Sequence, residues 1–144
     1  NQTHPLTEEE LDMLPTYYVM EAGKTMPETV IAEMPSEPSG WLTENELSIY
    51  CREYARTGFQ GGLNWYRARL AGVDVAKRRP IRVPTTFIAG QRDWGVYQSP
   101  GSFESMQRTL GANMRGVHFV EGAGHWVQQE QPEATSGLIL NCLI

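Results

Sequence analysis

The chain has 144 residues, with 12 lysines and arginines against 17 aspartates and glutamates, so its formal net charge at pH 7 is −5. Hydrophobic residues make up 40% and charged residues 20%, which is typical of a folded globular chain and argues against a disordered tail or a nucleic-acid-binding protein. No apolar run approaches the roughly 18 residues of a membrane span, and residues 1–5 lack the regions of a signal peptide. We therefore expect a soluble, cytoplasmic protein with neither a nucleic acid nor a membrane as partner.

The first part of the chain carries helix start signals. Thr7 and Glu10 have the spacing of a capping box, and Pro15 ends the helix that this box predicts. Thr25 or Pro27 begins a second short helix, which stops before a loop rich in proline and serine.

A stronger helix signal follows this loop. Thr43 and Glu46 form a second capping box, and apolar side chains then share one helical face until Gly58 ends the helix. These side chains are Leu47, Tyr50, Cys51 and Tyr54. A further helix is predicted over residues 62–70, closed by Gly72.

The second part of the chain is rich in β-branched residues. Residues 81–90 form one predicted strand, with Pro84 near its start, and residues 116–122 form another. Residues 100–110 between them have helical spacing, and a proline-initiated helix begins at Pro132. This order of strand, helix, strand, helix predicts a parallel sheet in an α/β fold. Two strands are too few for such a sheet, so we expect further strands beside them.

Residues with catalytic potential follow both predicted strands. Asp93 comes directly after the first strand, and His125 comes directly after the second. Because the carboxyl ends of parallel strands meet at one edge of a sheet, these two side chains are expected to lie together. A carboxylate that accepts the imidazole Nδ1–H holds the ring as a general base. The competing interpretation is structural, since an aspartate after a strand is often a turn residue and a histidine beside glycines is often not catalytic.

Other classes of site have little support in the sequence. Three histidines are too dispersed for a metal site, and no phosphate-binding or dinucleotide-binding loop occurs, so we expect no metal and no cofactor. Two cysteines, Cys51 and Cys142, are too few for a disulfide framework. The basic cluster at 77–79 is expected to be a solvated linker.

The motifs at the strand ends resemble a known family. The run at 83–94, Val-Pro-Thr-Thr-Phe-Ile-Ala-Gly-Gln-Arg-Asp-Trp, is followed by Gly-Ala-Gly-His-Trp-Val-Gln-Gln-Glu-Gln-Pro-Glu at 122–133. Together they resemble the C-terminal part of an α/β-hydrolase. The Leu-Asn-Trp-Tyr-Arg motif at 63–67 and the aromatic residue after the histidine are similar to those of epoxide hydrolases.

The resemblance covers nearly the whole chain and implies its domain organisation. Residues 1–79 match part of a helical cap, and residues 80–144 match the end of the α/β-hydrolase core. The implied fold class is α/β, the C-terminal part of an α/β-hydrolase fold with parallel strands and flanking helices, plus part of a helical cap.

The resemblance also implies residue roles in opening an epoxide to a vicinal diol. An aspartate nucleophile forms an alkyl-enzyme ester, Tyr66 donates its hydroxyl proton to the leaving oxygen, and His125, oriented by Asp93, activates the water that hydrolyses the ester. Three tryptophans are expected to bind a small apolar substrate, an epoxide or an ester. They are Trp65, Trp94 and Trp126. Packing of the cap helix is the competing explanation for Tyr66 and Trp65, and Tyr17 and Tyr18 are expected to be packing residues.

The sequence lacks the nucleophile elbow that enzymes of this fold place before the acid and the histidine. The amino-acid sequence of residues 72–76 is similar to that of a nucleophile elbow, but a predicted helix rather than an apolar strand precedes these residues. We therefore expect the nucleophile in an N-terminal half outside this chain, which would act as its partner. Two alternatives remain, a serine-type esterase of the same superfamily and a non-catalytic module that binds a second copy through its exposed sheet edge.

Overall fold

The computed structural model describes residues 7, 14–72 and 81–143, and these residues form two compact units. The first unit combines the described residues of Asn1–Glu37 with those of Ile81–Ile144, and the second lies within Pro38–Pro80. Most of the helix predicted to begin at Thr7, and the basic cluster at 77–79, lie outside the described residues. None of the helices in the described part of the chain combines the length and the apolar character that crossing a bilayer requires.

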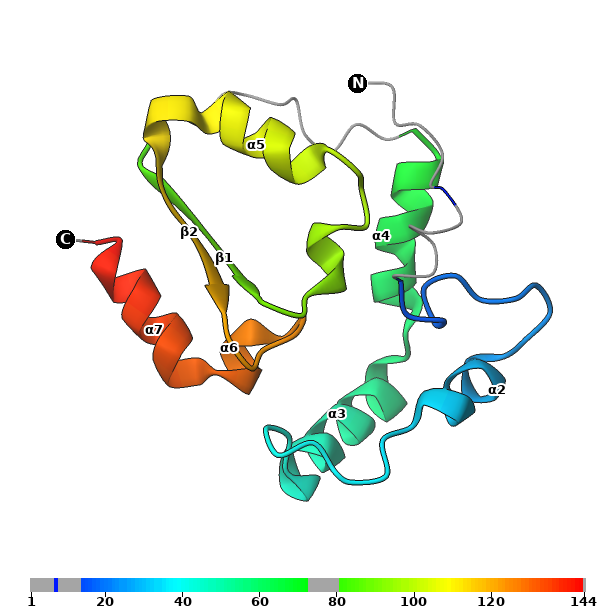
Figure 1. Cartoon of the computed structure of the whole chain (residues 1–144). Coiled ribbons are helices and arrows are strands. Elements are labelled where there is room, and N and C mark those ends of the chain that lie inside the picture. The colour runs from blue at the N-terminus through cyan, green and yellow to red at the C-terminus, as the bar shows by residue number, and fades with distance from the viewer. Residues whose placement is uncertain (1–6, 8–13, 73–80, 144) are drawn as a thin grey trace. The chain divides into compact units, whose positions relative to one another are not determined.

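A parallel pair of strands forms the centre of the first unit (Figure 1). β1 is Thr85–Gly90 and β2 is Met114–Val120, with Phe87 paired to Val117 and Ala89 paired to Phe119. β1 begins after Pro84 rather than at Ile81, in keeping with a proline that has no N–H to donate to a neighbouring strand. β2 begins two residues earlier than the sequence predicts. The prediction of an α/β fold with parallel strands is confirmed.

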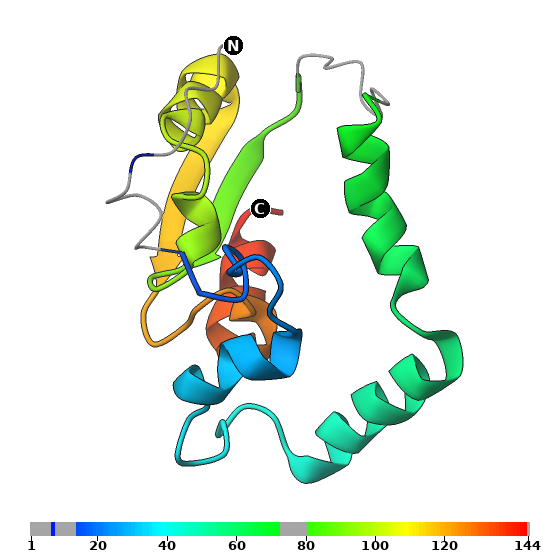
Figure 2. The ribbon, with the colours of Figure 1, turned by 90° about the vertical axis from the view of Figure 1, so that its right-hand side faces the viewer.

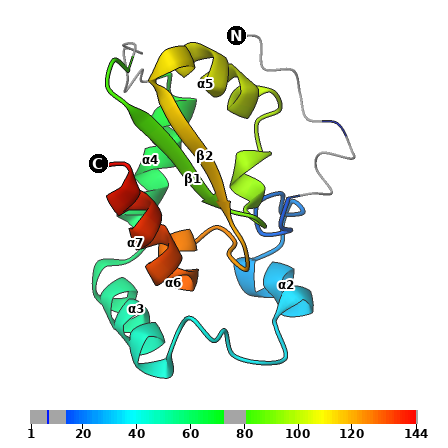
Figure 3. The ribbon, with the colours of Figure 1, turned by 60° about the vertical axis from the view of Figure 1, so that its left-hand side comes forward.

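Helices lie on both sides of this strand pair. α5, Ser102–Leu110, connects β1 to β2, and α7, Pro132–Asn141, lies on the opposite side of the strands (Figures 1 and 3). Three phenylalanines pack between α5 and the sheet, with Phe103 at 5.1 Å from Phe87 and 5.7 Å from Phe119 between ring centroids. The smaller side chains Ala89, Leu110 and Val120 are buried. This small core holds the carboxyl ends of both strands in place.

One short helix was not predicted from the sequence. α6, Val127–Glu130, lies between β2 and α7 and is only four residues long. Four residues are too few to show a helical repeat of apolar side chains, so no periodicity marks it. α7 then begins at Pro132, as predicted.

The first unit also contains the predicted helix after Thr25. α2 is Met26–Val30, and a turn of 3-10 helix, Ile31–Glu33, continues it. The backbone N–H of Thr25 donates to Glu28 Oε2 at 2.8 Å, which supports the start of the helix.

The second unit consists of two successive helices (Figure 2). α3, Glu44–Thr57, starts at the predicted capping box and ends at Gly58, whose φ of 67° is readily adopted by glycine. α4, Gln60–Leu70, begins two residues earlier than predicted. Both helices are confirmed, and the rings of Tyr54 and Phe59 stack across the bend between them at 4.5 Å.

Candidate active site

Asp93 lies in the turn that follows β1 and is held there by backbone hydrogen bonds from both strands. Gln91 N donates to Val120 O at 2.9 Å, and Asp93 N donates to Gly90 O at 3.1 Å. The Asp93 side chain begins a turn of 3-10 helix, Trp94–Val96, by accepting from Gly95 N at 2.7 Å. The carboxylate is mostly buried, with 13% of its side chain exposed.

His125 lies in the loop after β2 and contacts this carboxylate. Its Nδ1 is 2.8 Å from Asp93 Oδ1. An ionised carboxylate can only accept a hydrogen bond, so the proton of the neutral ring lies on Nδ1 and the lone pair on Nε2 is available. The imidazole remains 43% exposed and therefore accessible to a reactant. This arrangement can remove a proton from water at Nε2 and stabilise the resulting imidazolium.

Glycines make the close approach of the two loops possible. A Cβ at Gly90 would lie 2.1 Å from the backbone oxygen of Gly124, a distance that no side chain could tolerate. A Cβ at Gly95 would lie 2.9 Å from Asp93 Oδ1 and 3.2 Å from His125 Nδ1. The Asp93–His125 pair therefore depends on the absence of side chains at these positions.

Further contacts of the two loops were missed at the sequence level. Arg92 Nη2 donates to Gly122 O at 3.1 Å and so joins the loop after β1 to the loop after β2. Glu130 Oε2 accepts from Gly124 N at 2.8 Å, and Glu130 Oε1 accepts from Trp126 N at 3.0 Å. No spacing rule predicts such contacts, because they arise only when loops and a short helix are packed together.

Two of the three predicted substrate-binding tryptophans flank His125. The Trp94 ring stacks on the imidazole, with centroids 5.0 Å apart and 23° between the ring planes. Trp126 meets the imidazole edge to face at 5.4 Å. Tyr18 packs against Trp94, with the two ring centroids 4.2 Å apart. His125 is thus set among aromatic rings.

Trp65 and Tyr66 lie in the second unit. Both are on α4, and both are exposed, at 60% and 53%. Successive residues on a helix point about 100° apart, so the two side chains leave α4 in different directions. The roles predicted for Tyr66 and Trp65 stay predictions.

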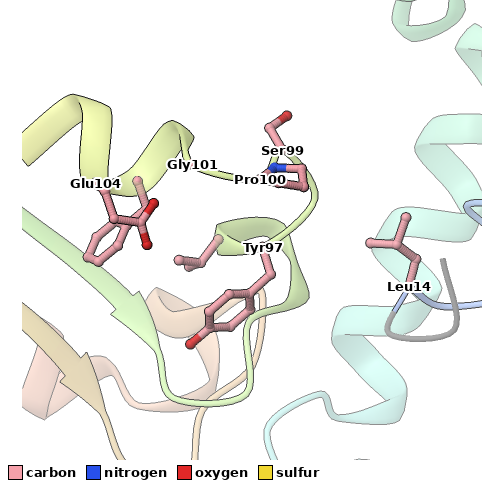
Figure 4. Close-up of a pocket in the computed structure, with 8 residues that line it drawn as sticks. Leu14, Tyr97, Ser99, Pro100, Gly101 and Glu104 are labelled. Carbon is pink, nitrogen blue, oxygen red and sulfur yellow. The ribbon is translucent and has the colours of Figure 1, made fainter. Parts of the chain in front are cut away.

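A hollow of about 330 Å³ borders the Asp93–His125 pair. Asp93 and His125 line it together with apolar side chains. These include Phe87, Ile88, Phe103 and Met106. A smaller hollow of about 180 Å³ lies apart from the pair, lined by Leu14, Tyr97 and Glu104 among others (Figure 4). Among the described residues, no group of three or more histidine, cysteine, aspartate and glutamate side chains is arranged to bind a metal ion.

Comparisons with known proteins identify relatives of one kind. No family model matches the chain. The chain is 39% identical over 129 residues to epoxide hydrolase A of Mycobacterium tuberculosis, which covers 78% of this chain and 36% of the relative. It is 36% identical over 112 residues to epoxide hydrolase B of the same organism, covering 76% of this chain and 31% of the relative. The chain thus spans about a third of the length of these curated relatives.

Solved structures give the same result. Potato (Solanum tuberosum) epoxide hydrolase I matches with a TM-score of 0.68 and 29% identity, covering 94% of this chain and 44% of the other. An epoxide hydrolase from Vigna radiata matches with a TM-score of 0.66 and 27% identity, covering 85% of this chain and 40% of the other. The resemblance stated from the motifs is confirmed. The chain belongs to the epoxide hydrolase family of the α/β-hydrolases and corresponds to a C-terminal portion of that fold.

Proposed function

We propose that this chain supplies the water-activating half of an epoxide hydrolase, in which His125 and Asp93 hydrolyse a covalent alkyl-enzyme ester. The observation that carries the proposal is the 2.8 Å contact between His125 Nδ1 and Asp93 Oδ1 beside an apolar hollow. The relatives named epoxide hydrolases support the substrate class.

The proposed reaction has two steps. An aspartate carboxylate attacks one carbon of the epoxide, the carbon–oxygen bond of the ring breaks, and the oxygen takes a proton to become a hydroxyl group. His125 Nε2 then takes a proton from water as the water oxygen attacks the ester carbonyl. The ester bond to the alkyl oxygen breaks, the proton held by His125 passes to that oxygen, and the diol leaves. The second proton of the water, left on the carboxyl group, returns to the phenolate that donated in the first step, so the carboxylate and the phenol are both restored.

Other residues have proposed roles in the first step and in binding. The Tyr66 hydroxyl donates the proton to the epoxide oxygen. Trp65, Trp94 and Trp126 hold a small apolar substrate and keep bulk water from the ester. In this proposal residues 1–79 belong to a helical cap, residues 80–144 belong to the core, and Asp93, His125 and the nucleophile form a catalytic triad.

The nucleophile is proposed to lie in an N-terminal half of the protein, which is then the partner of this chain. The same Asp93–His125 pair would serve an esterase if that nucleophile were a serine. The substrate range therefore separates the two activities, because an aspartate nucleophile supports turnover of epoxides and a serine supports turnover of carboxylic esters.

The proposal is tested by His125→Ala in the protein that joins this chain to its nucleophile. Without the base, the ester should form and persist, so the mass of the protein rises by the mass of the epoxide while turnover falls about 100-fold or more. His118→Gln, a change at a histidine on β2 outside the pair, is the matched control and should turn over normally. Full turnover by His125→Ala would contradict the role of the histidine.

A further inference from the structure

We propose that Glu130 is a positioning residue for His125. This inference rests on the proposed function for its kinetic consequence, but its structural part is independent. The carboxylate of Glu130 accepts hydrogen bonds from the backbone N–H groups on both sides of the histidine. Oε2 accepts from Gly124 N at 2.8 Å, and Oε1 accepts from Trp126 N at 3.0 Å.

Two bonds at these positions control the direction of the histidine side chain. The N–H of Trp126 belongs to the peptide group directly after His125, and the N–H of Gly124 belongs to the peptide group between Ala123 and Gly124, so the two groups enclose Gly124 and His125. Holding both groups against one carboxylate restricts the backbone rotation that would swing the imidazole away from Asp93. Hydrogen bonds to an ionised acceptor are stronger than those between neutral groups, so a carboxylate suits this purpose better than an amide.

The carboxylate is itself held in place by the short helix that carries it. Glu130 is the last residue of α6, and its own N–H donates to Trp126 O at 2.9 Å. The buried hydroxyl of Thr135, on α7, donates to Val127 O at 3.1 Å and ties α6 to α7. The position of His125 is thus linked through Glu130 to the helix that follows it.

Gly124 allows the close contact that this arrangement needs. A Cβ at this position would lie 3.3 Å from Glu130 Oε1, tighter than most real contacts of that kind. Both carboxylate oxygens of Glu130 are engaged by backbone donors of the loop. Its role is to hold the loop while Asp93 holds the ring.

The structural part is tested by nuclear magnetic resonance on the protein that joins this chain to its nucleophile. Glu130→Ala should weaken the downfield signal of the His125 Nδ1 proton and speed hydrogen exchange at the Gly124 and Trp126 amides. Glu133→Gln, which removes an exposed acid three residues later, should leave both signals as in the wild type. If Glu130→Ala keeps the Nδ1 proton signal unchanged, the proposal is overturned whether or not the protein hydrolyses epoxides.

The kinetic part uses the protein that also contains the nucleophile. Glu130→Ala should slow hydrolysis of the ester by about 100-fold, as expected for a misplaced catalytic group, and leave formation of the ester unchanged. Glu130→Gln keeps one acceptor oxygen and should give an intermediate rate. Leu110→Ala, which removes a buried apolar side chain from α5 and leaves both loop bonds in place, is the control for reduced stability and should not slow one step selectively.

The outcomes separate this inference from the proposed function. Equal slowing of both steps by Glu130→Ala and by Leu110→Ala would assign Glu130 a purely structural role and overturn the proposal. Absence of any ester in His125→Ala would refute the proposed function instead, and the magnetic resonance result would then decide the positioning role alone.

Discussion

At the scale of single residues, the candidate site depends on one carboxylate oxygen that accepts two hydrogen bonds. Asp93 Oδ1 receives the N–H of Gly95 at 2.7 Å and the imidazole of His125 at 2.8 Å. The first bond fixes the carboxylate within its own turn, and the second fixes the ring against it. Gly95 is therefore as important for the geometry as the two side chains that carry the chemistry.

Gly95→Ala should disrupt the Asp93–His125 pair. The added Cβ would lie 2.9 Å from Asp93 Oδ1 and 3.2 Å from His125 Nδ1, so one of these side chains must move. We expect a loss of about 1–3 kcal/mol in the free energy of unfolding, measured with urea, together with a weaker Nδ1 proton signal.

Gly137→Ala is the matched control for this substitution. Gly137 lies within α7, and a Cβ there would meet no atom within 4 Å. Alanine is a better helix former than glycine, so this variant should be more stable than the wild type by up to about 1 kcal/mol. A wild-type Nδ1 proton signal and an unchanged unfolding free energy for Gly95→Ala would contradict the prediction.

At the scale of elements, the helix starts follow local signals that the sequence displays directly. Thr43 N donates to Glu46 Oε2 at 2.8 Å, and Glu46 N donates to Thr43 Oγ1 at 3.3 Å, which is the reciprocal pattern of a capping box. The Thr43 hydroxyl binds the carboxylate of Glu46 and is the larger cause of a pKa that lies below the ordinary value of a glutamate. The hydrogen bond from the Thr43 backbone N–H is the smaller cause.

The direction of this shift predicts how the start of α3 responds to pH. A pKa that is lower in the folded helix means that the carboxylate contributes stability above its unfolded pKa. That contribution is lost as the pH falls through the folded pKa. The N-terminal turn of α3 should therefore fray on acidification, with a lower protection factor at the Glu46 amide, relative to the intrinsic exchange rate at each pH, as the readout.

Thr43→Val tests the cause of the shift by nuclear magnetic resonance titration of the Glu46 carboxyl carbon. Removing the hydroxyl should raise the pKa of Glu46 toward the ordinary value of a glutamate. Ser48→Ala removes a hydroxyl that donates to Asn45 O in the same helix and should leave the titration of Glu46 unchanged. An unaltered Glu46 titration in Thr43→Val would show that the capping box is not its cause.

At the scale of the whole molecule, the described residues form only two strands, and the first unit has a small core. Two strands leave backbone donors and acceptors unpaired along their outer edges, and such edges pair readily with other chains. Because the chain spans about a third of its curated relatives, an N-terminal half and a second copy of this chain are both candidate partners for these edges.

The isolated 144-residue chain should associate in a concentration-dependent manner. Sedimentation velocity should show species larger than a monomer as the protein concentration rises. Added salt should not dissolve them, because the net charge of −5 opposes association and salt screens that repulsion. A single monomeric species at every concentration would contradict this expectation.

Much of the fold could be predicted because its signals are local. The capping box at Thr43, the glycine at 58 and the proline at 132 set helix ends through interactions within a few residues of chain. The β-branched run before Asp93 likewise indicates β1. Ligand sites lie at the carboxyl ends of parallel strands, and this rule predicted that Asp93 and His125 lie close together. In the structure His125 Nδ1 is 2.8 Å from Asp93 Oδ1.

The sequence by itself determined the helices α2, α3, α4, α5 and α7, the α/β class, the resemblance to the family and the two residues at the strand ends. Only the tertiary structure revealed that Gly95 must lack a side chain, that Glu130 binds the backbone around His125, and that α6 exists between β2 and α7. The physical reason is the range of the interactions. Local signals act within one or two helical turns, whereas these contacts form when separate loops are brought within hydrogen-bonding distance by packing of the core.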